Sequence, residues 1–519
     1  MSWKEEVEGI RARRKLAQAL GGAEGVAAQR EAGRMTVRER IDSLFDPGSF
    51  NEHGPIAGYS EQDENGQLKS FSPANYVLGV GEIDGRRVVV GGEDFTTKGG
   101  SPTPAGQRKS VMAEELAVRY RLPLVRLLEG GGGSVPRRGD SKAAGGFVES
   151  VNAPHRFLSM MRAMAIAPVA SAALGPVAGR PAARRVASHF TVMSRKTSQV
   201  MIAGPRVVER ARGVSMTKEE LGGPAVHQKS GVIDCVAEDE VDALAQIRRF
   251  FSYLPHNVWE PAPRIACDDP IDRREQALLE LVPRERRKGY SMRKLIESIV
   301  DLGSFFELTP KYGRSQIAGL ARFNGQPVGM IANDPYHYAG AMTASGAQKL
   351  TRFLDTCETF HLPIVSLVDE PGFLIGPEAE ADATIRHGTR ALFAVVQSTV
   401  PWIAITTRKV FGVAGAAHFG PECLTYNWPS AEQGAIPLEG GVAVAYRREI
   451  ESAPDPEVRR REIEESLAAK RSPFARAEAF GVADLLDPRD TRPTICDWIE
   501  LIQPQLKEHR GERQFSVRP

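Results

Sequence analysis

The sequence predicts an α/β protein built from two homologous halves in tandem. The apolar runs LPLVRLLEGGGG (122–133) and LPIVSLVDEPGF (362–373) both begin with Leu-Pro and both lead into an acid and a glycine-bearing turn. Other residues match at the same offset of 240 positions, namely Gly85 with Gly325, Gly100 with Gly340, Lys109 with Lys349 and Glu129 with Asp369. Several matches in one register favour internal duplication over chance.

Each half is expected to open with a β-hairpin and to continue with a helix. Asp84-Gly85 separates YVLGVGEI from RRVVVGG, and Asn324-Gly325 separates IAGLARF from QPVGMIA. Such a two-residue loop between β-like runs is typical of a tight hairpin. The stretches 107–121 and 346–361 then place apolar residues near i, i+3 and i+4, which predicts helices ahead of the Leu-Pro strands.

A further strand is expected to complete each half. Pro168 opens VASAALGPVAG and Pro401 opens WIAITTRKVFG, and each proline precedes a glycine, Gly179 or Gly412, by 11 residues. Both runs are therefore interpreted as strands that end in a turn of small residues.

The domain limits follow from composition. Residues 256–285 are rich in proline and charge, as inter-domain linkers are. The prediction is an N-terminal domain over 1–255, a linker over 256–285 and a C-terminal domain over 286–519.

Length and composition also limit the function. A chain of 519 residues exceeds the size at which one hydrophobic core stops growing, which favours at least two domains. The formal net charge of +2 is too balanced to indicate a nucleic-acid or membrane partner. The five cysteines have no disulfide or metal-binding spacing, and the sequence shows neither a secretory signal nor a membrane-spanning run. A cytoplasmic protein without a metal centre is expected.

The repeated turns are the candidate catalytic elements. A strand that ends in a glycine turn and a helix start presents backbone N–H groups, because the first helical amides have no intrahelical acceptor. Fixed donors of this kind stabilise a developing oxyanion. The candidates are Gly179 and Arg180 in the first half and Gly412, Val413 and Ala414 in the second. The alternative is that each glycine only permits close packing or a positive φ.

Other catalytic motifs are absent from the sequence. GGGG at 130–133 is not followed by the Lys-Ser/Thr of a phosphate-binding loop, and neither a G-x-S-x-G elbow nor an H-E-x-x-H pair occurs. Either the chemistry needs little side-chain acid or base, or the proton acceptor comes from another molecule.

Four segments make the sequence resemble a known family. They are GRMTVRERIDSLFDPGSFNEHG (33–54), TKEELGGPAVHQKSGVIDCVAEDEVDAL (217–244), LVDEPGFLIGPEAEADATIRHGTRALFAVVQSTVP (367–401) and LLDPRDTRP (485–493). In this order they resemble the carboxyltransferase β subunits of biotin-dependent acyl-CoA carboxylases, such as propionyl-CoA and methylcrotonoyl-CoA carboxylases. The resemblance runs from about residue 33 to residue 493.

The resemblance implies a fold and an assembly. Each half would be a crotonase-like ββα-spiral domain. The subunits would form a hexamer, a trimer of dimers, with each active site between the first half of one subunit and the second half of its partner. The first half would hold the acyl-CoA, and the second would receive carboxybiotin carried by a separate biotin carboxylase or biotin carboxyl carrier subunit.

The resemblance also implies residue roles. The turn at Gly179 and Arg180 would hold the thioester oxygen, and the turn at Val413 and Ala414 would hold the biotin ureido oxygen. Biotin would be lined by PGFLIG, including Gly372 and Phe373, together with Gly412. The segment with Gly100, Ser101 and Lys109 would bind the CoA substrate, with Lys109 near its phosphates, although a solvated lysine on a helix face is an equal alternative.

Three departures from the family pattern bear on the substrate. Arg180 stands where family members have glycine, so its side chain would crowd the acyl pocket or pair with an anionic group. Ala416 replaces an acid, and LLEGGGGSVPRRGDSKAAGG (127–146) is unusual. An acyl group other than plain propionyl, larger or acidic, is expected.

Three alternatives stay open. The chain could act in the decarboxylase or transcarboxylase direction of the same half-reaction. It could be a biotin-independent crotonase-like hydratase or hydrolase, which would need an acid near the acyl site. It could also be a scaffold subunit without activity, because of the substitutions at Arg180 and Val413.

Overall fold

The computed structural model describes residues 2–132, 157–469 and 472–513. The chain forms two compact units. The first runs to Glu260 and includes the chain from Gly511, and the second is Pro261–Arg510. The boundary falls within the Pro-rich segment predicted to be a linker.

The first unit is built on an eight-stranded mixed sheet. The strands follow the order β1 (Asn51–Glu52), β4 (Tyr76–Ile83), β5 (Arg86–Glu93), β6 (Leu124–Gly130), β7 (Val169–Ala178), β8 (Phe190–Ser194) and β10 (Cys235–Ala237), with β9 (Gln199–Met201) on β7. The pairs β1–β4 and β4–β5 are antiparallel, and all later pairs are parallel.

The second unit repeats this topology strand for strand. Its order is β11 (Phe306–Leu308), β12 (Gln316–Phe323), β13 (Gln326–Asn333), β14 (Ile364–Glu370), β15 (Trp402–Phe411), β16 (Leu424–Asn427) and β18 (Asp484–Leu485), with β17 (Glu432–Gly434) on β15. Its first two pairs are again antiparallel and the rest parallel. The predicted internal duplication is confirmed.

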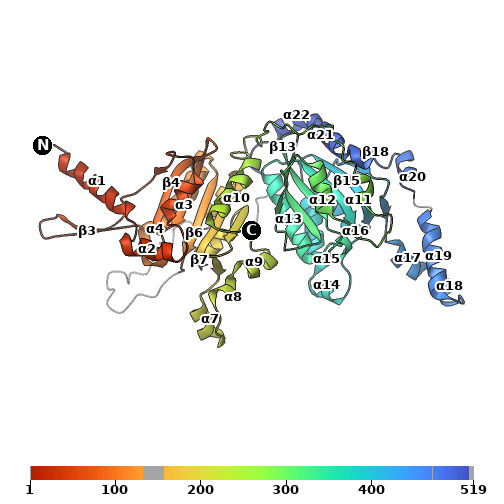
Figure 1. Cartoon of the computed structure of the whole chain (residues 1–519), viewed down its shortest axis with the longest axis horizontal. Coiled ribbons are helices and arrows are strands. Elements are labelled where there is room, and N and C mark those ends of the chain that lie inside the picture. Colours follow the sequence, from red (N-terminus) through yellow and green to blue (C-terminus); the bar gives the residue numbers. More distant parts are fainter. Residues whose placement is uncertain (1, 133–156, 470–471, 514–519) are drawn as a thin grey trace. The chain divides into compact units, whose positions relative to one another are not determined.

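Helices flank both sheets (Figure 1). The first unit also has a separate hairpin of β2 (Gly58–Gln62) and β3 (Leu68–Pro73). Its helices are α1 (Lys4–Gln18), α2 (Gly22–Glu31), α3 (Val37–Leu44), η1 (Lys98–Gly100), α4 (Pro104–Tyr120), α5 (Leu158–Ile166), α6 (Arg180–Val186), α7 (Pro205–Arg212), α8 (Lys218–Gly222), α9 (Pro224–Ser230) and α10 (Glu240–Tyr253).

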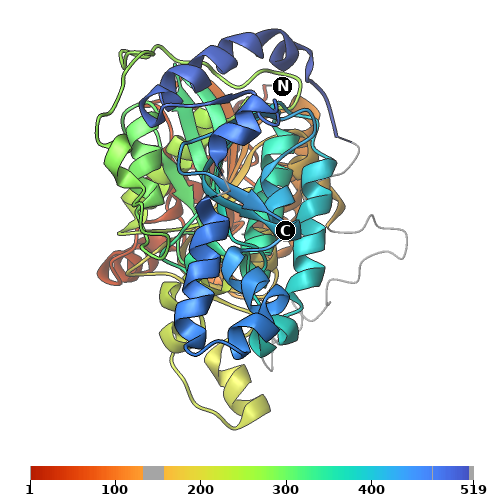
Figure 2. The ribbon, with the colours of Figure 1, turned by 90° about the vertical axis from the view of Figure 1, so that its right-hand side faces the viewer.

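The helices of the second unit are α11 (Leu278–Leu281), α12 (Met292–Ile299), η2 (Tyr338–Gly340), α13 (Ala344–Thr359), α14 (Pro377–Ala381), α15 (Thr384–Val396), α16 (Gly412–Gly415), η3 (Ala416–His418), α17 (Leu438–Ala445), α18 (Arg447–Glu451), α19 (Pro456–Ala469), α20 (Pro473–Glu478), η4 (Pro488–Asp490), α21 (Thr491–Leu501) and α22 (Gln503–Glu508). Figure 2 faces this unit and shows its teal helices α13 and α15 side by side at one flank of the strands.

The predicted hairpins and helices are confirmed. Asp84-Gly85 joins β4 to β5 with φ values of 51° and 72°, and Asn324-Gly325 joins β12 to β13 with 48° and 75°. These left-handed pairs are the geometry that Asx-Gly loops favour. Helices α4 and α13 occupy the two predicted stretches, and both begin with a threonine side chain, Thr103 or Thr343, that accepts a hydrogen bond from a glycine amide three residues on.

The acid of each Leu-Pro strand lies at a β-bulge. The register with the next strand shifts between Leu128 and Gly130 in one unit and between Val368 and Glu370 in the other, so Glu129 and Asp369 occupy the irregular position. Both carboxylates are fully buried and paired, Glu129 with Arg34 and Arg40 and Asp369 with Arg408. Burial and pairing at the same position of both units indicate a structural role for both acids.

Each unit has its own apolar core. In the first unit, Leu78, Val89 and Leu124 from the sheet pack on Leu116 of α4. In the second, Ile317, Val328 and Val365 pack on Leu295 of α12, and α21 contributes Ile495 and Ile499. Among the described residues, no helix is long and apolar enough to cross a membrane.

The two hairpin glycines provide a stability test. A Cβ on Gly325 would lie 1.8 Å from the Ile265 carbonyl oxygen, whereas a Cβ on Gly85 would meet nothing within 4 Å. Both glycines have positive φ, so alanine at either site should cost about 1 kcal/mol of conformational strain. Gly325→Ala should cost about 1–3 kcal/mol more, because the Ile265 segment must move. Chemical unfolding of the two variants measures the difference, and equal destabilisation would contradict it.

Candidate active site

The turn after β7 needs glycine for two reasons. Gly179 has φ 67° and ψ −129°, and a Cβ there would lie 3.0 Å from the Cα of Gly132. The Gly179 amide donates to the Met201 carbonyl at 3.3 Å and so extends the β7–β9 ladder. Arg180, which is half-buried, begins α6 directly after this turn.

A pocket with about 360 Å³ of empty space opens beside this turn. It is lined by Asn75, Tyr76, Glu93, Gly100, Pro102, Gly106, Gln107, Ser110, Arg180, Pro181 and Arg184. The structure thus brings Gly100 and Arg180, 80 positions apart in the sequence, to the walls of one pocket.

Asn75 fixes the wall that carries Gly100. Its side-chain amide donates to the Ser101 carbonyl at 2.6 Å and accepts from the Thr103 hydroxyl at 2.8 Å. Gly100 has φ 65°, and a Cβ there would lie 2.5 Å from the Glu129 carbonyl oxygen. Gly100 lines the pocket and sits where the chain passes close to the bulge of β6, whereas the neighbouring Ser101 does not line the pocket.

The floor of the pocket is ionic. Arg184 donates to Glu93 at 3.3 Å, to Glu114 at 3.2 Å and to the Tyr76 hydroxyl at 3.2 Å. Arg126 bonds the same Glu114 carboxylate at 3.2 Å. All five side chains are buried, so their mutual pairing compensates for lost hydration.

Burial governs the protonation of this floor. It raises the pKa of Glu93, against the opposing charge of Arg184 and weaker effects of the Glu93 and Glu129 backbone amides. Burial also raises the pKa of Tyr76 and lowers that of Arg126. For Arg184, the pKa is raised because Tyr76 and the two carboxylates outweigh the effect of burial.

Lys109 lies on α4 with its amine turned to a neighbouring loop. The amine donates to the Gly54 carbonyl at 3.2 Å and lies 4.0 Å from Glu52, and the residue is 8% exposed. Burial lowers its pKa to about 8, against the charge of Glu52 and with a small contribution from Arg38. The equivalent Lys349 is also buried and bonds two carbonyls, which indicates a shared structural role.

The second unit places its two predicted turns together. Gly372 has φ 126°, and a Cβ there would lie 3.8 Å from the carbonyl oxygen of Phe411, the residue before Gly412. The Phe373 ring lies where a Cβ on Gly388 of α15 would be, 2.1 Å from its nearest atom. Gly412 has φ 64° and is exposed, as is Val413, whereas Ala414 is fully buried.

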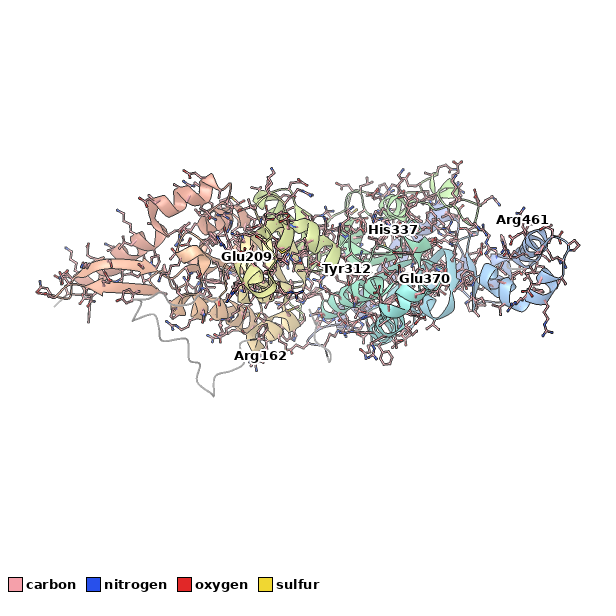
Figure 3. The ribbon with its side chains drawn as sticks, turned by 90° about the horizontal axis from the view of Figure 1, so that it is seen from below. Arg162, Glu209, Tyr312, His337, Glu370 and Arg461 are labelled. Atoms are coloured by element: carbon pink, nitrogen blue, oxygen red, sulfur yellow. The ribbon has the colours of Figure 1, made fainter. Side chains whose placement is uncertain are left out.

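A buried network supports these turns from below. Glu370, at the end of β14 and labelled in Figure 3, accepts from the amides of Gly372 and Met342, both at 3.1 Å. Its other oxygen accepts from Asn333 at 3.0 Å and lies 3.5 Å from His418 of η3. Burial raises the pKa of Glu370, with His418 opposing the shift. The network connects the 371–373 turn to the segment after Val413.

Sequence reasoning missed the ionic floor. Glu93, Arg184 and Tyr76 lie at strand ends or within a short helix, where single charged or aromatic residues are common. The internal repeat offered a signal for Glu93. At the offset of 240 positions Glu93 matches Asn333, and each of the two residues ends the second strand of its hairpin. The unusual segment 127–146 lies, from residue 133 on, outside the described residues, and no group of metal ligands occurs among the residues described.

The family follows from this architecture and from comparison with known proteins. The family model described as "Carboxyl transferase domain" matches residues 28–516, so the chain belongs to that family. The resemblance to carboxyltransferase β subunits of acyl-CoA carboxylases is confirmed.

Individual relatives cover the whole chain. It is 33% identical over 523 residues to the "Propionyl-CoA carboxylase, carboxyltransferase subunit" of Haloferax mediterranei, covering 100% of both proteins. It is 32% identical to the "Methylmalonyl-CoA decarboxylase subunit alpha" of Veillonella parvula, with 99% of each covered. The solved transcarboxylase 12S, a hexamer with methylmalonyl-CoA bound, matches at TM-score 0.85 and 31% identity over 100% of this chain and 98% of that one. The predicted fold of two tandem crotonase-like ββα-spiral domains is confirmed.

The Lys109 amine should give a measurable pH dependence of stability. The pKa of Lys109 is lower in the folded state than in the unfolded chain. Below about pH 8 the folded state therefore carries a buried charge that lowers its stability, and this cost disappears as the pH rises toward 10.5. Relative to Lys109→Met, the wild type should gain on the order of 2–3 kcal/mol between pH 7 and pH 10. Parallel unfolding curves at both pH values test this. A constant difference between the two proteins would contradict it.

Proposed function

We propose that this chain transfers a carboxyl group between biotin on a separate protein and the α carbon, or a vinylogous carbon, of an acyl-CoA. The observation that carries the proposal is the repeated glycine turn, in which a sheet strand leads into a helix that begins at Arg180 in one unit and at Gly412, just before Val413, in the other. The named relatives act in this chemistry, which supports applying it here.

The first turn would stabilise the thioester oxygen. Because the Gly179 amide extends the β7–β9 ladder, the main donor proposed here is the Arg180 amide, at the mouth of the 360 Å³ pocket. A fixed backbone dipole needs no reorganisation as negative charge develops on the oxygen, which is how such donors accelerate enolate formation. Gly100, which also lines the pocket, would orient the thioester, and Ser101 and Lys109 stay proposed as CoA contacts.

The second turn would hold biotin. Gly372 lacks a Cβ where its turn approaches Phe411, the exposed Gly412 follows Phe411, and the half-buried Phe373 offers an apolar flank, so the residues fit a flat polar ring with an apolar edge. When bound, biotin supplies the carboxyl group and a nitrogen that can accept the α proton. Val413, Ala414 and the Glu370 network would keep the turn in place, and no side-chain base is required of this chain.

The partners and the assembly are proposed on the same basis. A biotin carboxylase or carrier subunit would deliver biotin, and the chain would form a hexamer, as the transcarboxylase 12S does. The direction of transfer is open, because decarboxylase and carboxylase subunits match at nearly equal identity. A cytoplasmic location stays a prediction.

Proline substitution tests the two backbone donors. Proline in the first turn of a helix removes the N–H and keeps a helix-compatible φ, whereas alanine keeps the N–H. Arg180→Pro should therefore transfer carboxyl groups about 10²-fold more slowly in kcat/KM than Arg180→Ala, and Val413→Pro more slowly than Val413→Ala by a similar factor. Equal rates within either pair would contradict the assignment of that turn.

Carboxyl transfer itself is tested with the partner subunit. The chain, a biotinylated partner, ATP and labelled bicarbonate are incubated with acetyl-, propionyl- and butyryl-CoA and with larger or acidic acyl-CoAs. Label is expected in at least one acyl-CoA, and not at equal rates in the three simple ones, because Arg180 narrows the pocket. A stable complex that labels none of them would favour the scaffold role.

A further inference from the structure

In the pocket of the first unit, the Glu93 carboxylate has a hydrogen-bond partner at only one of its two oxygens. Glu93 is 6% exposed and lines the pocket. Its Oε1 accepts from Arg184 at 3.3 Å. The Glu93 and Glu129 backbone amides lie close enough to lower the pKa of this carboxyl, but neither reaches Oε2 with hydrogen-bond geometry, and Oε2 has no other partner among the residues that the structure describes. A buried carboxylate oxygen in this state is costly unless a donor reaches it from the pocket.

The equivalent position in the second unit is fully satisfied. Asn333 donates to the Gly340 carbonyl at 3.1 Å and to Glu370 at 3.0 Å, and it accepts from the Asp369 amide at 2.9 Å. The same backbone arrangement can therefore supply hydrogen-bond partners for a polar side chain at this position. In the first unit the position holds Glu93, and one of its carboxylate oxygens is left for the pocket.

The charges around Glu93 select the kind of donor. Glu93 and Glu114 balance Arg126 and Arg184 in this cluster, and Arg184 lines the pocket beside Glu93. A cationic group on the ligand would face the Arg184 guanidinium, and an anionic group would face the Glu93 carboxylate. A neutral hydroxyl meets neither repulsion and can donate to the carboxylate oxygen.

We propose that the acyl pocket of this chain selects acyl-CoA thioesters that bear a hydroxyl group, which donates a hydrogen bond to Oε2 of Glu93. The inference rests on the proposed function, since it takes the pocket beside Arg180 as the acyl site. A plain alkyl chain would displace water from Glu93 and leave its oxygen unpaired, which is how polar sites reject analogues without the matching group.

Binding measurements on the purified full-length chain test the selection without turnover. Calorimetric titration compares 3-hydroxybutyryl-CoA with butyryl-CoA, which differ only in the hydroxyl, and with succinyl-CoA as an acidic probe. The wild type should bind 3-hydroxybutyryl-CoA on the order of tenfold more tightly than butyryl-CoA. Glu93→Met should reduce the ratio to about one, whereas Glu93→Gln, which keeps an acceptor oxygen and the side-chain volume, should retain a preference.

The matched control is Glu115→Gln. Glu115 is an exposed acid on α4 that does not line the pocket, so this variant makes the same change of charge and should keep the wild-type ratio. Equal affinities of the wild type for the two butyryl thioesters, tighter binding of succinyl-CoA than of 3-hydroxybutyryl-CoA, or an unchanged ratio in Glu93→Met would overturn the selection alone. If none of the thioesters bound, the acyl-CoA site of the proposed function would fall as well.

Discussion

One interruption in each sheet sets the position of the candidate site. The Leu-Pro strand pairs with its neighbour for five residues and then breaks register at Glu129 or Asp369. Beyond this bulge the neighbouring strand pairs with β9 in place of β8, or with β17 in place of β16, and continues into the glycine turn. A bulge of this kind bends a strand and redirects the residues beyond it. The turns at Gly179 and Gly412 owe their positions to it.

The buried acid at each bulge is stabilised by an arginine that neutralises its charge. Arg40 lies 2.6 Å from Glu129 and also bonds Glu240 of α10, so one guanidinium connects α3, the sheet and the last helix of the first unit. Arg408 takes the corresponding role at Asp369 and stacks on the Tyr290 ring. Removal of Arg408 would leave the buried Asp369 without its arginine, which proteins rarely tolerate, whereas Glu129 would keep Arg34 after loss of Arg40.

The two units have diverged on this common frame. Where the second unit connects Asn333, Glu370 and His418 into a closed network under its turns, the first has Glu93, Arg184 and Tyr76 around a pocket. The backbone places a glycine turn at the same position in both units. The buried side chains next to these turns differ between the units. In the second unit they support the turn, and in the first unit they line a pocket that can contact a ligand.

The duplication, both hairpins, the helices α4 and α13 and the small-residue turns could all be predicted from the sequence alone. Short-range patterns encode them: Asx-Gly loops, apolar periodicity and a Leu-Pro start. Long motifs identified the family in the same way. The folded chain was needed to establish that the sheet uses the Gly179 amide, that Lys109 is buried against Gly54, and that Glu93 meets Arg184 across 91 positions. Those outcomes depend on contacts between distant segments, which no local pattern records.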